Sequence, residues 1–518
     1  MMCERPHAKQ SKKYTKKRAL ALILGGIFMK LHALLKSLHD FRELPEKNPQ
    51  ITSIEVNSKQ VQQGSLFICI KGHNVDGHKF AKEAINHGAL AIVSEQLLDV
   101  DVPVILVRSS VRALSLLVNA FYDQPTSKMT LIGVTGTNGK TSVTYLIDSI
   151  LKKSGQNVGL IGTIGMTIGN EFFPTKNTTP DALVLQKMFH TMVERKVETA
   201  VMEVSSHALH IGRIQGCQYD VTVFTNLSQD HLDYHKTMDA YKAAKSLLFS
   251  QLGNVYDINR PKFAVLNVDD EATNHYITST QGIVLTYGID HSADLKASNI
   301  GMSSKGTTFD LTFHHQTYQV QMGLIGKFNV YNVLAAIGAC LASGLPLNEI
   351  LDHISCLEGV PGRFDLVDLG QDFTVIVDYA HTPDGLENVL KTAKEFATGN
   401  IYCVVGCGGD RDQTKRPIMA KIATELSDFT TFTSDNPRTE QPQQILNDME
   451  VGVVNKRYSI IVDRKDAITH SINQAKTGDI VLIAGKGHED YQIIGETIVF
   501  FDDRLVAADV IKERLQSE

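Results

Sequence analysis

The sequence lacks several features that would assign it to a particular environment. Its seven cysteines are scattered through 518 residues without a CxxC pair, so neither a disulfide framework nor a zinc site is indicated. Positive charge is not in excess, since 57 acidic residues outnumber 51 lysines and arginines, which argues against a nucleic acid as partner. Internal repeats and low-complexity tracts are also missing. We therefore expect an ordinary globular protein with reduced thiols, working in the cytoplasm.

The apolar stretch at residues 19–29 is too short to cross a bilayer, which takes about 20 apolar residues. It follows a basic segment, and no convincing small-x-small cleavage site comes after it. Met29 offers a second start that opens directly onto the globular pattern. We predict that residues 1–28 are an extension outside the fold and that the protein does not insert stably into a membrane. A signal peptide or membrane anchor is the alternative.

The length and the alternation of short apolar strands with helical stretches predict an α/β protein of three domains. We place the domains at residues 29–127, 128–356 and 357–518. The central domain reads as a parallel sheet, because its buried strands are near-continuous apolar runs. The predicted strands lie at residues 65–70, 91–94, 129–134, 199–203, 221–225, 374–377, 401–405 and 480–483, and the predicted helices at 79–87 and 142–154. Because ligands of such sheets lie at the carboxyl ends of the strands, we expect the second and third domains to form the walls of the active site.

The strongest single motif follows the strand at residues 129–134. Its glycines allow backbone N–H groups to close around phosphate oxygens, its lysine neutralises charge, and its last hydroxyl can bind magnesium. The spacing departs from the general P-loop pattern, since Val134 stands six residues before Lys140 where a glycine is usual. The strand before it and the helix after it nevertheless predict an ATP site at Thr135-Gly136-Thr137-Asn138-Gly139-Lys140-Thr141.

Two further strand ends carry groups suited to metal and phosphate chemistry. Glu203 ends a buried strand, where a carboxylate beside a P-loop can hold the magnesium of a nucleotide. Residues 225–235 follow another buried strand and concentrate Asn, Asp and His, including His231. Surface or structural roles are the alternatives for both, but their positions at strand ends favour a catalytic site that includes Lys140, Glu203 and His231.

These motifs, in this order, resemble those of the Mur ligase family. The resemblance covers nearly the whole chain from Met29 and is carried by TGTNGKT, NTTP, MEVSSHAL, NLSQDHLDYH and AAKSLLF, followed by Asn329-Val330-Tyr331-Asn332, VPGRF at 360–364 and DYAHTPD at 378–384. It implies an N-terminal domain that binds a UDP moiety, a central P-loop ATPase-type domain and a C-terminal Rossmann-like domain. It also implies that Asn329, Arg363 and Asp378 help to bind ATP.

The resemblance implies an ATP-dependent amide ligase of peptidoglycan precursor synthesis, and so a role in cell-wall formation, cell shape and division. In such enzymes the D-glutamate side-chain carboxylate of a UDP-muramoyl dipeptide is phosphorylated, and an amine attacks the acyl phosphate. Positioning and charge neutralisation dominate such transfer. The residues that match substrate-holding positions are Ser58, within Asn57-Ser58-Lys59, together with Thr178, Thr179, Ser205 and Arg213. The resemblance further implies that Lys245 is carbamylated and binds Mg²⁺ with Thr141, Glu203 and His231.

The C-terminal block indicates which amino acid is added. Asp435-Asn436-Pro437-Arg438 resembles the motif of ligases that add meso-diaminopimelate to UDP-N-acetylmuramoyl-L-alanyl-D-glutamate. A guanidinium can hold the far carboxylate of diaminopimelate in a bidentate manner, whereas lysine has no such carboxylate. Arg411 is a second expected anchor, and Gly485 and Glu489 match positions that receive the other polar groups.

Two alternatives differ from this interpretation in testable ways. A lysine-adding ligase of the same family would not need Arg438 for a second carboxylate. A P-loop ATPase with a regulatory function would hydrolyse ATP without any amino acid, whereas a ligase would release phosphate only with both other substrates present.

Overall fold

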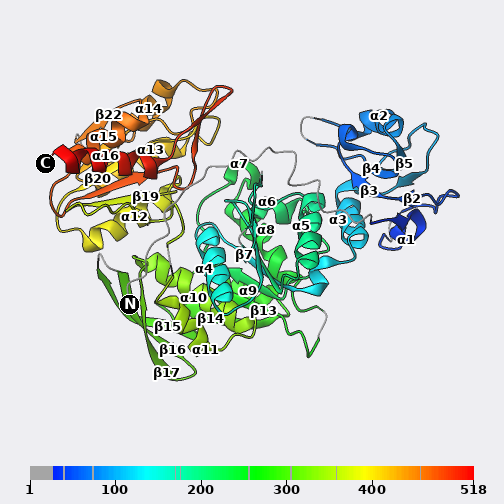
Figure 1. The fold of residues 1–518 in the computed structure, drawn as a ribbon, viewed down its shortest axis with the longest axis horizontal. Coiled ribbons are helices and arrows are strands. Elements are labelled where there is room, and N and C mark those ends of the chain that lie inside the picture. Colours follow the sequence, from blue (N-terminus) through cyan, green and yellow to red (C-terminus); the bar gives the residue numbers. More distant parts are fainter. Residues whose placement is uncertain are drawn as a thin grey trace.

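The structure is a computed structural model that describes residues 27–517, apart from residues 39–40, 73–74, 170, 176, 255–256, 304–305, 358 and 455–456. Three α/β parts follow one another along the chain (Figure 1). The N-terminal part, in blue, and the C-terminal part, in yellow to red, lie on opposite sides of the central part. The predicted extension at residues 1–28 lies outside the described residues except for its last two positions.

The N-terminal part contains a parallel four-stranded sheet in the order β3-β4-β5-β6, beside a small antiparallel pair, β1-β2. Its elements are β1 (Met29–Lys30), α1 (Leu31–Leu35), β2 (Gln50–Ile51), β3 (Ser53–Glu55), the 3₁₀ turn η1 (Ser58–Gln60), β4 (Ser65–Ile68), the 3₁₀ turn η2 (Gly77–Phe80), α2 (Ala81–Asn86), β5 (Ala89–Ser94), β6 (Val104–Leu106) and α3 (Ser110–Phe121). The helix predicted at residues 79–87 is therefore shorter, because the side chain of Asp76 caps a 3₁₀ turn that comes first.

The central part is built on one long mixed sheet. Its strands are β7 (Thr130–Thr135), β8 (Val158–Ile161), β9 (Met166–Ile168), β10 (Glu171–Phe173), β11 (Thr199–Glu203), β12 (Val221–Phe224), β13 (Phe263–Asn267), β14 (Ile283–Gly288), β15 (Leu295–Ser303), β16 (Gly306–Phe313) and β17 (Gln316–Met322). Its helices are α4 (Lys140–Lys153), α5 (Ala182–Glu194), α6 (Ser206–His210), α7 (Leu232–His235), α8 (Met238–Ser250), α9 (Thr273–Ser279), α10 (Lys327–Ala342) and α11 (Leu347–Ile354). A 3₁₀ turn, η3 (Pro125–Lys128), leads into β7.

The order of strands in the central sheet brings the predicted catalytic motifs together. Among the described residues the order is β10-β9-β8-β11-β7-β12-β13-β14-β15-β16-β17, and pairing is parallel from β8 through β15. Strand β7 lies between β11 and β12, with Glu203 paired to Val134 and Phe224 paired to Thr135. The glycine-rich loop after β7, Glu203 at the end of β11 and the segment after β12 therefore meet at one edge.

Helices cover both faces of this sheet, which explains why its central strands are apolar on both sides. The buried side chains of α4, α10 and α11 pack on one face, and those of α5, α8 and α9 pack on the other. The packing fixes the sheet edge on which the glycine-rich loop lies.

The C-terminal part is a second sheet with helices on both faces. Its elements are β18 (Asp365–Leu366), β19 (Thr374–Asp378), α12 (Pro383–Phe396), β20 (Ile401–Val405), α13 (Lys415–Leu426), β21 (Phe429–Phe432), α14 (Pro442–Glu450), β22 (Tyr458–Ile460), α15 (Arg464–Gln474), β23 (Ile480–Ala484), β24 (Tyr491–Ile494), β25 (Thr497–Phe500) and α16 (Asp503–Ser517). The described strands run β18-β19-β23-β20-β21-β22, parallel except for β18, and β24-β25 forms a separate hairpin. The loops after β19, β23, β20 and β21 thus lie side by side at one edge.

The expected α/β class is confirmed, and most predicted elements are present with small shifts. The strands predicted at residues 199–203 and 401–405 match β11 and β20 to the residue. Helix α4 begins at Lys140, two residues earlier than predicted, because Gly139 has a φ of 84° and the helix starts directly after it. The domain boundaries at residues 127/128 and 356/357 stay a prediction.

Candidate active site

The glycine-rich loop between β7 and α4 forms a cradle that only glycine permits. Gly136 has a φ of 151°, and a Cβ atom there would lie 1.9 Å from the Thr225 hydroxyl oxygen. The first N–H groups of α4 have no side-chain cap. N–H groups without a cap and the positive end of the helix dipole together favour an anion.

Lys140, the first residue of α4, folds back over this loop. Its Nζ donates hydrogen bonds to the backbone oxygens of Gly136 at 2.9 Å and Thr137 at 2.7 Å. Burial lowers the pKa of Lys140, whereas the nearby carboxylates of Glu203 and Asp230 raise it. The ammonium group is therefore held at the loop, where it can neutralise an incoming phosphate.

Glu203 ends β11 with a carboxylate that is 1% exposed and satisfied by three donors. The hydroxyl of Thr141 donates to it at 3.1 Å, and Thr163 donates through its backbone N–H at 2.8 Å and its hydroxyl at 3.1 Å. A buried carboxylate that lies beside a P-loop and is held by hydroxyl groups suits a hard cation with oxygen ligands.

Lys245 projects from α8 to the same loop and is 1% exposed. Its Nζ donates to the backbone oxygen of Gly136 at 2.8 Å and lies 4.5 Å from the centre of the Tyr241 ring. Burial, followed by the charge of Lys140, lowers the pKa of Lys245 well below its usual value. Burial therefore favours the neutral amine over the ammonium form at this position.

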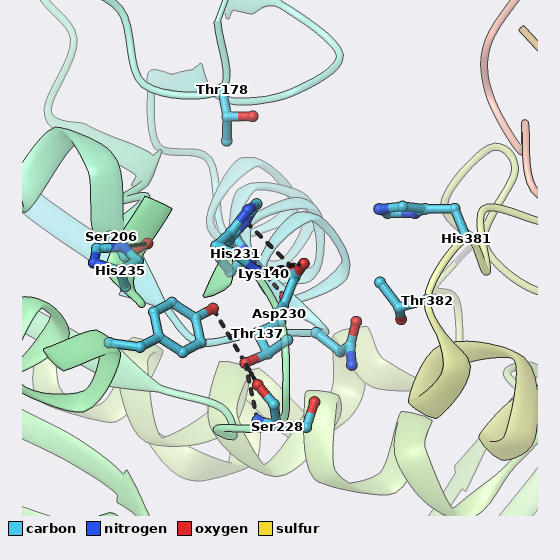
Figure 2. Close-up of polar contacts among 12 residues, drawn as sticks. Thr137, Lys140, Thr178, Ser206, Ser228, Asp230, His231, His235, His381 and Thr382 are labelled. Carbon is cyan, nitrogen blue, oxygen red and sulfur yellow. Dashed lines mark hydrogen bonds and ion pairs between the residues drawn. The ribbon is translucent and has the colours of Figure 1, made fainter. Parts of the chain in front are cut away.

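His231 lies in the segment after β12, next to Asp230. Its Nε2 is 3.3 Å from the Asp230 carboxylate, and its φ of 55° turns the backbone so that α7 can begin. Desolvation lowers the pKa of His231 to about 4, although Asp230 acts in the opposite direction. A neutral imidazole is the form that binds a metal ion. Figure 2 shows His231 and Asp230 close to Lys140.

One cavity of about 370 Å³ joins these groups. Most of the predicted catalytic, nucleotide and substrate residues line it, on both sides of the glycine-rich loop. They are Gly136, Thr137, Asn138, Gly139, Lys140, Thr141, Thr178, Thr179, Glu203, Ser205, Arg213, His231, Lys245 and Arg363. Thr135 lies behind the loop, where its hydroxyl donates to the Val204 oxygen at 2.8 Å.

The predicted substrate residues near β11 support one another. Thr179 donates its hydroxyl hydrogen to the Glu203 backbone oxygen at 2.9 Å and accepts from the Ser205 N–H at 3.0 Å. Arg213 donates to the Thr179 backbone oxygen at 2.9 Å. These bonds connect Thr179, Ser205 and Arg213 to the strand that carries Glu203.

The C-terminal part supplies the opposite wall. The guanidinium of Arg363 lies 4.4 Å from the centre of the Tyr379 ring and 3.5 Å from the Thr141 hydroxyl oxygen. Figure 2 shows the His381 side chain pointing from this side toward Lys140. Asp384, at the start of α12, accepts hydrogen bonds from the Asn138 side chain at 2.6 Å and the Ser228 hydroxyl at 3.0 Å. The glycine-rich loop is therefore bonded directly to the C-terminal part.

A second cavity, of about 550 Å³, adjoins the first and shares six lining residues with it: Asn138, Gly139, Ser142, Arg363, Tyr379 and His381. Asp378 lines it and accepts from the Phe364 N–H at 2.6 Å, while burial raises the pKa of this carboxyl to about 6. Asn329 does not line either cavity. It accepts a hydrogen bond at 3.2 Å from Asn332, which does line the second cavity.

The residues predicted to select the amino acid cluster at the C-terminal sheet edge. Asn436 donates to the Glu489 carboxylate at 2.9 Å, and a Cβ on Gly485 would lie 2.9 Å from an Asp435 oxygen. Arg438 donates to the Gly409 backbone oxygen at 2.7 Å. Arg411 lies on the same loop as Gly409 and is exposed, and Pro437 is buried beside Arg438.

Ser58 lies apart from these residues, in the N-terminal part. Its hydroxyl donates to the Glu83 carboxylate at 2.9 Å, and it lines neither cavity. The structure thus places most of the residues predicted for the nucleotide and for the amino acid at the edges of two sheets, with Ser58 at a distance from both.

Several residues of the site carry little signal in the sequence. Thr163 contacts Glu203 but belongs to none of the motifs named above. Asp230, His381 and Asp384 lie inside named motifs, where residue type alone indicates no role. Their positions after strand ends are the signal that could have found them. Within the described residues, no three His, Cys, Asp or Glu side chains form a ready metal-binding group.

A parallel sheet with a phosphate-binding loop, facing a second α/β wall, defines a nucleotide-dependent enzyme. Three family models match the chain in order: the Mur ligase family catalytic domain at residues 50–122, the Mur ligase middle domain at 134–340, and the Mur ligase glutamate ligase domain at 362–487. The chain belongs to the Mur ligase family, which confirms the resemblance read from its motifs.

Individual relatives match over nearly their whole length. The chain is 60% identical to UDP-N-acetylmuramoyl-L-alanyl-D-glutamate–2,6-diaminopimelate ligase of Bacillus cereus, with 95% of this chain and 100% of the relative covered. It is 55% identical to the ligase of the same name in Geobacillus thermodenitrificans, covering 94% and 100%.

Solved structures agree with the fold. One of a ligase with the same name superimposes with a TM-score of 0.69 at 35% identity, covering 94% of this chain and 100% of that one. A MurF ligase from Thermotoga maritima, in complex with ADP, shares the fold at 19% identity with a TM-score of 0.60, covering 90% and 97%. In the described part of the chain, no helix is both long and apolar enough to cross a membrane.

Proposed function

We propose that the protein is an ATP-dependent ligase that joins meso-diaminopimelate to UDP-N-acetylmuramoyl-L-alanyl-D-glutamate during peptidoglycan precursor synthesis. The observation that carries this proposal is the meeting of two sets of groups. The phosphate-binding loop, Glu203 and Arg213 line one cavity together with Tyr379 of the C-terminal wall, and the cluster around Arg438 belongs to the same C-terminal part, outside the cavity lining. The names and full-length match of the relatives support the same substrates.

ATP fits across the two adjoining cavities. The smaller one contains the glycine-rich loop and Lys140, so it suits the phosphates. The larger one is lined by Phe328, Tyr331 and Asn332, which offer aromatic faces and amide groups to a nucleoside. Asn329 would act through Asn332, and Arg363 lines both cavities. The ADP in the structure of the Thermotoga maritima ligase supports this proposal.

The chemistry requires activation, because a carboxylate does not condense with an amine at neutral pH. In the proposed reaction the γ-phosphoryl group of ATP passes to the D-glutamate side-chain carboxylate, which forms an acyl phosphate and releases ADP. The amine of diaminopimelate, after losing a proton, attacks the carbonyl carbon, and the tetrahedral intermediate expels phosphate. Lys140 and Arg363 are placed to neutralise the transferring phosphoryl group.

The donor set near the loop fits magnesium. Glu203 offers a buried carboxylate, Thr141 a hydroxyl 3.1 Å from it, and His231 a neutral imidazole. These donors are too few to enclose an ion, which suits Mg²⁺, since it usually keeps water and phosphate oxygens as ligands. Such an ion would supply charge neutralisation at the phosphates. Carbamylated Lys245 would add a second anionic ligand beside the loop.

The muramoyl substrate would lie along the central part. Thr178, Thr179, Ser205 and Arg213 line the smaller cavity, where they can hold the dipeptide portion. The N-terminal part, which contains Ser58, lies on the far side of the central part from the C-terminal wall (Figure 1). An elongated nucleotide substrate with its UDP end at Ser58 matches this arrangement.

The cluster at the C-terminal sheet edge fits diaminopimelate better than lysine. Arg438 and Arg411 offer guanidinium groups for carboxylates, and Glu489 offers an anion for an ammonium group. The cysteines described in the structure are all free, which suits a reducing compartment, and we place the protein in the cytoplasm.

The test is phosphate release measured with each substrate omitted in turn. The proposal expects release only when ATP, the dipeptide nucleotide and diaminopimelate are all present, with a new amide product of the matching mass. Release without an amino acid would instead indicate a P-loop ATPase, and equal release with lysine would indicate the lysine-adding ligase.

A further inference from the structure

The two arginines of the C-terminal cluster lie on different loops that are bonded to one another. Arg411 is on the loop after β20, and Arg438 is on the loop after β21. The hydroxyl of Thr439 donates to one Asp410 oxygen at 2.7 Å, and the Thr439 N–H donates to the other at 3.2 Å. Each partner of this contact is the immediate neighbour of one arginine.

Further bonds join the same two loops. The N–H of Asp410 donates to the Glu440 carboxylate at 2.6 Å, and the N–H of Gly409 donates to the Asn436 oxygen at 2.9 Å. The backbones approach so closely that a Cβ on Gly409 would lie 1.9 Å from the Pro437 oxygen. The loops therefore form one unit.

The backbone at Arg438, and at Asp410 directly before Arg411, is held in an unusual conformation. Asp410 has a φ of 54° and Arg438 a φ of 52°, in the left-handed region that residues other than glycine seldom adopt. Such conformations persist only where surrounding bonds impose them. The bonds between the loops thus determine the direction in which each arginine leaves its backbone.

The unit of the two loops is bonded to helix α13 through a buried arginine. Arg416, on α13, is fully buried, and it donates to Glu440 at 2.8 Å and to Asp448 at 2.7 Å. Glu440 therefore connects the loop of Arg411 to the helix beneath it. By contrast, Thr439 and Asp410 are exposed, so their contact contributes little to the stability of the whole protein.

We propose that Asp410 and Thr439 are positioning residues that fix the separation of the Arg411 and Arg438 guanidinium groups, and so select an amino acid with two carboxylates. The inference rests on the proposed function, because it takes diaminopimelate as the substrate. Neither residue touches the substrate. A guanidinium held in place recognises a carboxylate more tightly than one that must first be ordered, so the loop contact acts on binding of the amino acid.

The test replaces Thr439 by two residues that differ in one group. Thr439→Val removes the hydroxyl and keeps the shape and the N–H, whereas Thr439→Ser keeps the hydroxyl. We expect Thr439→Val to raise the KM for diaminopimelate about five- to tenfold, the effect of losing one typical hydrogen bond at an exposed site. The preference for diaminopimelate over lysine should fall by a similar factor. The KM for ATP and kcat should stay within about twofold of wild type, and the melting temperature within about a degree. Thr439→Ser should behave as wild type.

The outcomes separate this inference from the function on which it rests. A wild type whose phosphate release does not depend on diaminopimelate overturns both. A dependent wild type with an unchanged KM in Thr439→Val overturns the positioning role alone. Equal impairment of both variants, or a joint loss of ATP binding and kcat, would also overturn it, because a purely structural defect would not be rescued by serine.

Discussion

Replacing Lys245 by arginine tests the most unusual electrostatic feature of the site. The Nζ atoms of Lys245 and Lys140 donate to the same Gly136 oxygen, at 2.8 Å and 2.9 Å. The two nitrogens therefore lie at most the sum of these distances apart, about 5.7 Å. Two positive charges at that separation repel by about 3 kcal/mol at an effective dielectric constant of about 20.

Lysine can avoid this repulsion, but arginine cannot. Burial lowers the pKa of Lys245, which favours the neutral amine. The neutral amine can attack carbon dioxide to form a carbamate, with loss of one proton, and so change the local charge from positive to negative. Arginine keeps its proton in proteins. At about 1.4 kcal/mol per factor of ten, about 3 kcal/mol corresponds to a turnover at least a hundredfold lower in Lys245→Arg.

The assay is steady-state phosphate release at saturating substrates, with the melting temperature as a check on folding. Lys242→Arg is the matched control, since Lys242 lies on the same helix but pairs with Asp239 near the surface, and it should leave turnover unchanged. Lys245→Ala should be nearly inactive, and a small carboxylic acid should partly restore its activity. The turnover of Lys245→Glu should exceed that of Lys245→Arg. Full turnover in Lys245→Arg would refute both the carbamate and the charge argument.

Four other changes have definite expected outcomes. Lys140→Ala should lower turnover about a hundredfold or more in the same assay, because it removes a cation from the phosphate loop, and near-normal turnover would contradict the ATP site. Arg438→Ala should reduce the ratio of kcat/KM for diaminopimelate to that for lysine by about tenfold or more, and an unchanged ratio would exclude its role in selection. Asp384→Ala should raise the KM for ATP about tenfold, because the hydrogen bonds from Asn138 and Ser228 are lost. Rates measured over a range of ATP concentrations give this KM and would show a smaller change. Burial lowers the pKa of His488 to about 3, so below about pH 6.5 the unfolded chain binds more protons than the folded protein. The free energy of unfolding should therefore fall as the pH drops toward 3. Melting curves of His488→Gln should show a weaker dependence of stability on pH.

The sequence was most informative where function depends on strand ends. The apolar runs before Gly136 and before His207 identified two strands, and the site residues follow from the rule that ligands lie at carboxyl ends. Glycine positions were equally clear, because Gly136 and Gly139 adopt backbone angles that other residues seldom adopt. Local patterns thus indicated the site residues that the central part contributes.

Contacts between distant segments could not be predicted in this way. Asn138 and Asp384 are bonded although 246 residues separate them, and neither local pattern nor charge indicates that pair. Thr163 contacts Glu203 only because β8 and β11 are neighbours in the sheet, which depends on strand order. Asn329 is predicted to help bind ATP, and the structure places it beside Asn332, which lies one helical turn away and lines the larger cavity.

The wall shared by the two cavities matters for the design of inhibitors. Arg363, Tyr379 and His381 line both cavities, so a group bound against them in one cavity lies close to a group bound against them in the other. A single compound with an anionic end at the glycine-rich loop and an aromatic end in the larger cavity would keep its second end at a high effective concentration once the first had bound. With a short, rigid connector across Arg363, the compound would lose little conformational entropy on binding. The affinity of the joined compound would then exceed that of either fragment by a large factor.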